Sequence, residues 1–130
     1  MTLVRFIKND DGSAAVELAL TGPLYILFFV GFMMAAMLFW IQIGLQKSTE
    51  VSARCATINR GTCGTSEAIK TFASNYAKEK VYGFAIPASV FSHQLAACGN
   101  EVSANYAVPL INKLLGTTSI TLQARSCFPQ

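Results

Sequence analysis

The sequence contains few of the side chains from which catalytic sites are built. It has one histidine, His93, and its only aspartates are Asp10 and Asp11, close to the N-terminus. The later glutamates are dispersed along the chain: Glu50, Glu67, Glu79 and Glu101. No G-x-S-x-G, H-E-x-x-H or phosphate-binding glycine loop occurs. Because an enzyme needs several reactive groups in one arrangement, we predict a non-enzymatic protein without a cofactor.

Basic clusters and metal-binding spacings are also missing. The net charge is only +3, and the lysines and arginines form no basic run, which argues against nucleic acid as a partner. The cysteines form no C-x-x-C pair, and His93 has only Cys98 near it in sequence, so we predict no metal site. His93 can still be read as a general base, but without an evident partner it is better interpreted as a surface or strand histidine.

Charge is absent from one long stretch of the chain. Between Leu18 and Gln46 there is no acidic or basic residue. Residues 24–45 read LYILFFVGFMMAAMLFWIQIGL, which is long enough to cross about 30 Å of hydrocarbon as a helix. Tyr25 and Trp40 stand near the two ends, where amphipathic aromatic side chains favour the membrane interface. We predict one transmembrane helix.

The helix is expected to extend beyond the hydrocarbon. One continuous helix is predicted over residues 13–56, behind a polar leader of residues 1–12 and ahead of a small domain of residues 57–130. Gly22 and Pro23 interrupt the helical pattern, and because proline cannot donate an N–H, we expect a kink or a loosened turn there. The alternative is a tolerated kink without functional value.

Flanking charges do not decide the orientation of this helix. Basic residues lie on both sides of it, Arg5 and Lys8 before it and Lys47, Arg54 and Arg60 after it. All the cysteines follow the apolar segment, and an even number of them in a small domain is typical of an oxidising compartment. We therefore expect the N-terminus inside and the bulk of the chain outside. A conventional signal peptide is the alternative, but residues 34–36 lack a good A-x-A site and the apolar sequence continues past them.

The C-terminal part predicts an α+β fold. The first helix should stop at residues 59–62, which include a glycine, and a second helix should run from Ser66, as its cap, to about Val81. The apolar face of the second helix is expected to be core and consists of Ile69, Phe72, Ala73 and Tyr76. Strands are expected over residues 89–97, 101–108 and 119–126, with a turn at 98–100 and a longer connection over 109–116. The fold is thus a long N-terminal transmembrane helix followed by a small domain with a second helix and a short antiparallel sheet.

Four cysteines, Cys55, Cys63, Cys98 and Cys127, permit three disulfide pairings, and sequence alone does not choose among them. If the last two strands pair antiparallel, Cys98 and Cys127 fall close to opposite each other at the open end. That arrangement favours a Cys98–Cys127 bridge and leaves Cys55–Cys63 to close the turn between the helices. Each bridge would stabilise the small core by about 2–4 kcal/mol. The alternative is that some of the cysteines are buried thiols.

One carboxylate stands at the head of the apolar segment, in Gly12-Ser13-Ala14-Ala15-Val16-Glu17. A charge in bilayer hydrocarbon costs about 2.5–3.5 kcal/mol, so a membrane segment usually keeps one for a function. A polar leader, a glycine, a glutamate at the fifth position after it and an apolar helix form the layout of a type IV prepilin-like protein. Cleavage after Gly12 would give Ser13 an α-amino group, which Glu17 of a neighbouring subunit could neutralise. The alternative is that Glu17 is an interfacial carboxylate that reaches water.

With these residues the chain resembles the TadE family of minor pilin-like proteins of tight-adherence (Tad/Flp) pilus systems. The resemblance runs from Phe6 through residues 11–20, Pro23 and residues 46–54, and the segments 102–116 and 120–125 are similar to the family's closing strands. Its specific part is the first fifty residues. The resemblance implies processing by a prepilin peptidase between Gly12 and Ser13, and a role in pilus biogenesis rather than as the abundant shaft subunit, because the major Flp pilin is much shorter. Four cysteines are not a signature of the family.

Two functions of different classes follow. The first is a minor pilin or pseudopilin of the bacterial inner membrane, with a cytoplasmic N-terminus and a periplasmic C-terminal domain. Its partners would be prepilin peptidase, other pilin or pseudopilin subunits and the pilus assembly platform. The second is a static membrane-anchored periplasmic adaptor or binding protein that is never cleaved. Cleavage after Gly12, and dependence of filament formation on Glu17, would separate the two.

Overall fold

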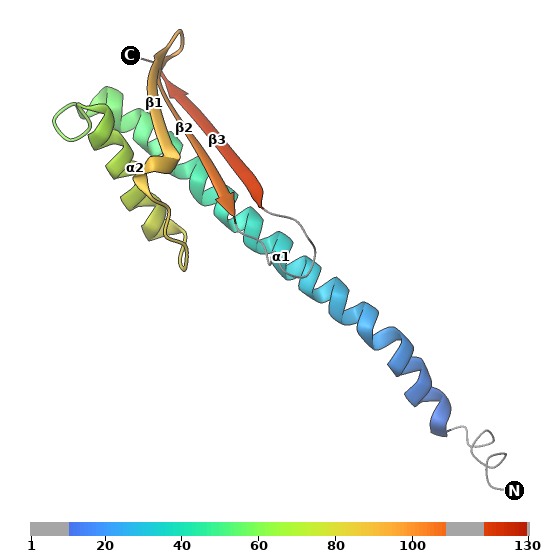
Figure 1. Ribbon diagram of the computed structural model, residues 1–130. Helices are drawn as coiled ribbons and strands as arrows, with labels where there is room; N and C mark the ends of the chain where they lie inside the picture. The colour runs from blue at the N-terminus through green and yellow to red at the C-terminus, as the bar shows by residue number, and fades with distance from the viewer. Residues whose placement is uncertain (1–10, 109–118, 130) are drawn as a thin grey trace, which may run out of the picture. The chain divides into compact units, whose positions relative to one another are not determined.

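The computed structural model describes residues 11–108 and 119–129. In chain order the elements are helix α1 (Asp11–Ile58), helix α2 (Ser66–Lys80), the 3-10 turn η1 (Ala88–Val90) and strands β1 (Phe91–Ala96), β2 (Gly99–Val108) and β3 (Ile120–Phe128) (Figure 1). The predicted α+β class is confirmed, since a long apolar helix is followed by a second helix and a three-stranded antiparallel sheet. Most of the expected leader and all of the expected connection at 109–116 lie outside the described residues.

The chain forms two compact units, one ending at Leu38 and the other beginning at Phe39. The helical backbone of α1 continues without a break through Gly22 and Pro23, so the predicted continuous helix is confirmed, while a bend of its axis at Pro23 stays a prediction. The segment expected as residues 13–56 is therefore shared between the two units. Ile41 and Leu45, at the end of the predicted membrane stretch, are fully buried in the second unit.

The connection between α1 and α2 follows from hydrogen bonding and one disulfide. Past the end of α1, the Asn59 carbonyl accepts a hydrogen bond from the Cys63 N–H at 2.9 Å, and Cys63 is bonded to Cys55. The N-cap of α2 is Thr65, whose Oγ1 accepts from the N–H of Ala68 at 3.2 Å. The prediction of Ser66 as the cap was therefore wrong by one residue. Both residues carry a hydroxyl, and Thr65 is the one with the extended backbone that an N-cap requires, at φ −124° and ψ 153°.

The sheet has the order β1-β2-β3, and both pairs of neighbouring strands are antiparallel. The first two strands meet at the Ala96–Gly99 pair, so the turn is Ala97-Cys98, whereas the predicted turn of residues 98–100 included two residues that belong to β2. Gly99 follows this turn with φ +122°, in the region that favours glycine, and a Cβ there would overlap the Phe128 carbonyl. The preferred pairing of the cysteines is present, because Cys98 is bonded to Cys127 at the end of β3.

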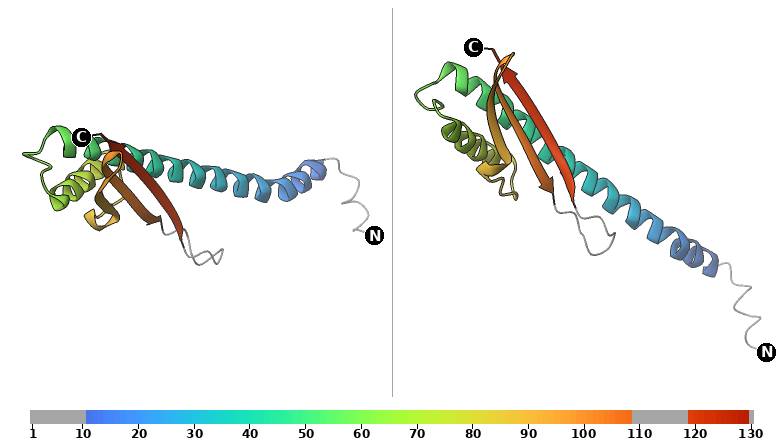
Figure 2. Two further views of the ribbon diagram at one scale, coloured as in Figure 1. Left: turned by 90° about the horizontal axis from the view of Figure 1, so that it is seen from above. Right: turned by 45° about the horizontal axis from the view of Figure 1, so that its top comes forward.

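The core of the second unit lies between the sheet and the two helices, with α2 and the later part of α1 on one face of the sheet (Figures 1 and 2). Its fully buried apolar residues include Ile41, Leu45, Ala53, Ala73, Ala77, Val81, Ile86 and Val102. The predicted apolar face of α2 is confirmed at Ile69 and Ala73, whereas Phe72 and Tyr76 are half-buried. The strands contribute Phe91, the largest fully buried side chain. Burial of these side chains supplies the main stabilisation of so small a domain.

Candidate functional site

The start of α1 carries the candidate processing and assembly residues. α1 begins at Asp11, so Gly12 and Ser13 lie in its first turn, and Gly12 is exposed with no atom near the position of a Cβ. Glu17 is exposed one turn later, and its backbone carbonyl accepts a hydrogen bond from Thr21 Oγ1 at 2.8 Å. The helix therefore presents the predicted cleavage point and the predicted assembly carboxylate on an accessible surface.

In the first unit α1 is apolar on all of its sides rather than along one stripe. Seven successive large residues are exposed there: Leu24, Tyr25, Ile26, Leu27, Phe28, Phe29 and Val30. A helix on the surface of a soluble protein has one apolar face, whereas a helix that is apolar all round is surrounded by lipid or by other helices. From Ala14 onward the helix is long and apolar enough to cross a membrane.

The uncharged part of α1 that belongs to the first unit, which ends at Leu38, has the length of a bilayer. From Glu17 to Leu38 an α-helix rises about 32 Å, against about 30 Å for the hydrocarbon core. Glu17 therefore stands at one end of a bilayer-length segment. That position is compatible both with an assembly role and with the alternative of an interfacial carboxylate that reaches water.

In the second unit α1 also covers the free edge of the sheet. Gln42 Nε2 donates a hydrogen bond to the carbonyl of Gln123 at 2.7 Å, and Gln46 Nε2 donates to that of Arg125 at 3.3 Å. β3 is an edge strand, and unpaired carbonyls on such a strand are a template for pairing with other chains. Two polar residues four apart on the helix thus protect β3. The role of Gln42 and Gln46 was not predicted, because nothing in the local sequence pattern indicates which strand lies beside the helix.

Glu101 is a buried carboxylate with two partners across the sheet. Its side chain is only 3% exposed and accepts hydrogen bonds from Gln94 Nε2 at 2.8 Å and from the guanidinium of Arg125. The hydrogen bond from Arg125, followed by that from Gln94, holds the pKa of Glu101 below its usual range. Glu101 therefore stays ionised and joins the three strands beside Cys127, its partner in the register. In the sequence Glu101 is one of several dispersed carboxylates, and its burial was not predicted.

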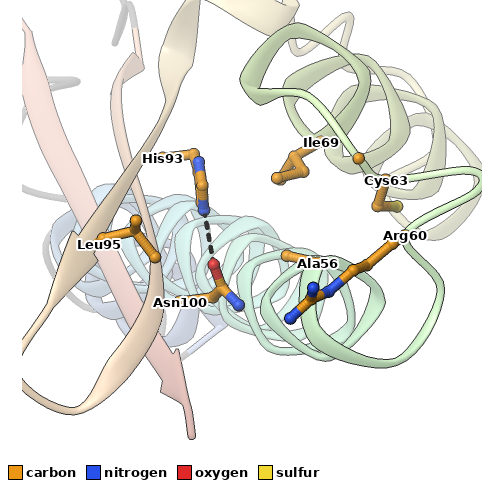
Figure 3. Close-up of a pocket in the computed structure, with 8 residues that line it drawn as sticks. Ala56, Arg60, Cys63, Ile69, His93, Leu95 and Asn100 are labelled. Atoms are coloured by element: carbon orange, nitrogen blue, oxygen red, sulfur yellow. Dashed lines mark hydrogen bonds between the residues drawn. The ribbon is translucent and has the colours of Figure 1, made fainter. Parts of the chain in front are cut away.

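A cavity of about 560 Å³ opens between the helices and the sheet (Figure 3). In it, His93 Nε2 lies 3.2 Å from Asn100 Oδ1, and Asn100 Nδ2 donates to Thr57 Oγ1 at 2.9 Å. The interpretation of His93 as a strand histidine is therefore confirmed, and the pairing of β1 with β2 brings it next to the Asn100 side chain. The Asn100 amide thus lies between His93 of β1 and Thr57 of α1.

The residues that line this cavity indicate a structural role for His93. The lining residues are Ala56, Arg60, Cys63, Gly64, Ile69, His93, Leu95 and Asn100. Among them is no carboxylate that would orient or activate His93, and Cys63 is held in a disulfide. Across residues 11–108 and 119–129, no three His, Cys, Asp or Glu side chains are grouped so as to hold a metal ion. The hydrogen-bonded row of His93, Asn100 and Thr57 thus ties β1 and β2 to α1.

Comparison with known proteins points to α1 as the functional element. No curated protein and no solved structure matches the chain. The family described as TadE-like protein matches residues 12–54, a segment that begins at the predicted cleavage point, includes Glu17 and contains the exposed apolar residues of α1 in the first unit. The predicted resemblance to the TadE family is thereby confirmed over residues 12–54.

Proposed function

We propose that the chain is a minor pilin-like protein of a tight-adherence (Tad/Flp) pilus, processed after Gly12 and active in pilus assembly or initiation through α1. One observation carries the proposal. Gly12 and Glu17 stand at the prepilin spacing at the head of a bilayer-length helix that is apolar on every side, inside the segment that matches the TadE-like family.

In the proposed mechanism α1 moves from one apolar environment, the membrane, into another, the interior of a filament. In the membrane the exposed side chains of α1 contact lipid, and in a filament the same side chains contact the helices of neighbouring subunits. Cleavage leaves an α-amino group on Ser13, and the Glu17 carboxylate of a neighbour neutralises it. In a poorly solvated site this attraction is much stronger than in water, so it sets the register between subunits. A helix with one polar face would leave that face without favourable apolar contacts, both in the lipid and among the helices of a filament.

The proposal also fixes a location and a set of partners. Prepilin peptidase cleaves the leader, the assembly platform and the other pilin or pseudopilin subunits receive the mature chain, and the bacterial inner membrane holds it beforehand. The second unit lies in the periplasm, where its two disulfides, Cys55–Cys63 and Cys98–Cys127, persist under oxidising conditions. The N-terminus lies in the cytoplasm.

The amino-terminal residue of the protein purified from its native membranes tests the proposal. Mass spectrometry should find Ser13 as the first residue, and a Gly12→Ala variant should retain the leader. Gly31→Ala is the matched control, because Gly31 is also an α1 glycine with open space around it and lies far from the cleavage point. A wild-type chain that still begins at Met1 in cells with an active peptidase would remove the pilin function and leave the static anchored adaptor.

Glu17→Gln separates the assembly role from simple anchoring. This variant should be inserted and cleaved normally, because the amide is nearly the same shape and remains at the end of the apolar segment, but it should fail to support pilus formation. Glu67→Gln is the control, since Glu67 is another exposed helical glutamate, paired with Lys70 on α2. Pilus formation at the wild-type level by Glu17→Gln would show that the carboxylate has no part in assembly.

A further inference from the structure

A groove lies between α1 and α2 in the second unit. It encloses about 320 Å³ and is lined by Trp40, Ile43, Gly44 and Lys47 of α1 and by Tyr76 and Lys80 of α2; we refer to these six residues as the interfacial groove. Its floor is Gly44, where α2 approaches so closely that a Cβ would overlap the side chain of Val81. Trp40 and Ile43 stay 57% and 61% exposed, although both are large and apolar.

The chemical character of the groove changes along α1. Its four α1 residues follow the spacing i, i+3, i+4 and i+7, so they share one face of the helix. Trp40 comes two residues after Leu38, where the bilayer-length segment ends, and Lys47 is the first charged residue after Glu17. From Trp40 to Lys47 the helix rises about 10 Å, which is enough to cross one headgroup layer of about 5–8 Å. An apolar wall therefore gives way to a cation over the distance between acyl chains and headgroups.

The two lysines are charged and accessible. Lys47 Nζ lies 2.8 Å from Glu50 Oε2, Lys80 Nζ lies 3.1 Å from Glu79 Oε1, and the two lysine side chains are 59% and 48% exposed. The glutamate hydrogen bonds raise the pKa of both lysines, so both stay protonated. Ion pairs this exposed are weak, and each ammonium has three donors, of which one carboxylate oxygen takes one. Both lysines can therefore also bind an anion.

Two further features extend the groove as a membrane-facing surface. Lys80 lies 5.6 Å from the centre of the Tyr76 ring, which holds the ammonium beside the aromatic wall. Tyr82, just beyond the end of α2, is 80% exposed. Tryptophan, tyrosine and lysine together are the side chains that favour the membrane–water interface.

We propose that the interfacial groove binds the headgroup of an anionic phospholipid in the leaflet next to the second unit. The phosphate lies between Lys47 and Lys80, and the glycerol and first methylene groups lie against Trp40 and Ile43. The lipid thereby contacts α2 at Tyr76 and Lys80, near its C-terminal end. The proposal rests on α1 crossing a membrane, not on cleavage after Gly12.

Trp40 is the only tryptophan in the chain, so its fluorescence reports directly on the groove. The full-length protein is placed in vesicles of phosphatidylcholine and phosphatidylglycerol in equal amounts, with bromine on the acyl chains of one lipid or of the other. Bromine quenches tryptophan on contact, and the ratio of quenching by the two lipids gives their relative affinity for the groove. A lysine near an anionic lipid surface is worth about a fivefold change in binding. We expect a preference for phosphatidylglycerol of about fivefold or more.

The double variant Lys47→Gln/Lys80→Gln should lower this preference to about one. Lys70→Gln is the matched control, because Lys70 also pairs with a glutamate, Glu67, at 2.8 Å, but does not line the groove. The proposal is overturned if the wild type shows no preference or if the double variant keeps it. It is equally overturned if neither brominated lipid quenches Trp40 of a membrane-inserted chain, since a second copy or another protein would then cover the groove. Because the first residue of the same samples is measured separately, failure of this proposal and failure of the pilin function are distinguishable.

Discussion

Removal of the two disulfides one at a time should reduce the stability of the second unit by unequal amounts. One double variant, Cys98→Ala/Cys127→Ala, removes the bridge with a sequence separation of 29. The other, Cys55→Ala/Cys63→Ala, removes the bridge with a sequence separation of 8. A cross-link restricts the unfolded chain more when the loop is longer, with an entropy change of about 2.1 + 1.5R ln n cal/mol/K. At 25 °C this gives about 3.6 kcal/mol for the longer loop and about 2.5 kcal/mol for the shorter one. The longer bridge should therefore be worth about 1 kcal/mol more.

A difference of this size is measurable because the unit is small. Native proteins are stable by only about 5–15 kcal/mol, and a domain of this size lies at or below the low end. Loss of the Cys98–Cys127 bridge also frees the end of β3, which is otherwise held by β2 and by the hydrogen bonds from Gln42 and Gln46. We expect the variant without Cys98 and Cys127 to be close to unfolding at 37 °C.

Urea unfolding of the full-length chain in mild detergent, followed by near-ultraviolet circular dichroism, measures the free energies of unfolding. Thiol labelling provides the control, because the native chain should label only after reduction. If removal of the Cys55–Cys63 bridge destabilised the unit as much as removal of the Cys98–Cys127 bridge, the loop-length reasoning would be refuted. Labelling of any cysteine in the unreduced chain would refute the pairing itself.

Three further predictions concern the packing of the same unit. Gly44→Ala should destabilise the second unit by about 1–3 kcal/mol despite the better helix propensity of alanine, because the new Cβ would overlap the Val81 side chain. Val81→Ala in the same chain should restore part of the loss. Equal stability of Gly44→Ala and the wild type in urea would contradict the close approach of these two residues. Phe91→Ala should cost about 3–5 kcal/mol in the same assay, because Phe91 is only 2% exposed and the remaining cavity cannot fully collapse. Glu101 has a lowered pKa in the folded chain, so its contribution to stability is present above the usual value of 4.5 and is lost as the pH falls below it. Thermal melts from pH 7 to pH 3 should show this loss in the wild type and a flatter acid limb in Glu101→Gln.

The elements of the fold were largely predictable because their signals are local. An uncharged stretch followed by polar residues predicts α1, the Asn59–Thr62 stop predicts its end, and the alternation in residues 119–126 predicts β3. Errors occurred where two neighbouring residues were equally suitable. Thr65 and Ser66 can both cap a helix, and the hairpin turn is Ala97-Cys98 rather than residues 98–100.

The candidate site divides in the same way. The Gly12–Glu17 spacing and the apolar helix behind it are features of consecutive residues, so they could be recognised without coordinates, and the match over residues 12–54 agrees with them. The partner of His93 could not be recognised, because Asn100 becomes its neighbour only through the register of β1 and β2. The burial of Glu101 was unpredictable for the same reason, since its two partners come from the strands on either side.

Local sequence patterns are enough to predict the uncharged helix of bilayer length, the glycine and glutamate at its N-terminal end, and the order of the helices and strands. Hydrophobic periodicity and helix length act between neighbours in the chain, so no tertiary contact is needed to read them. The burial of Ile41 and Leu45 in the core of the second unit, rather than in the membrane segment, is visible only in the folded chain. The tertiary structure also decided that α2 meets α1 at Gly44 and forms a groove with two lysines at its rim. These contacts join residues more than thirty positions apart, and their energies depend on packing that no local pattern encodes.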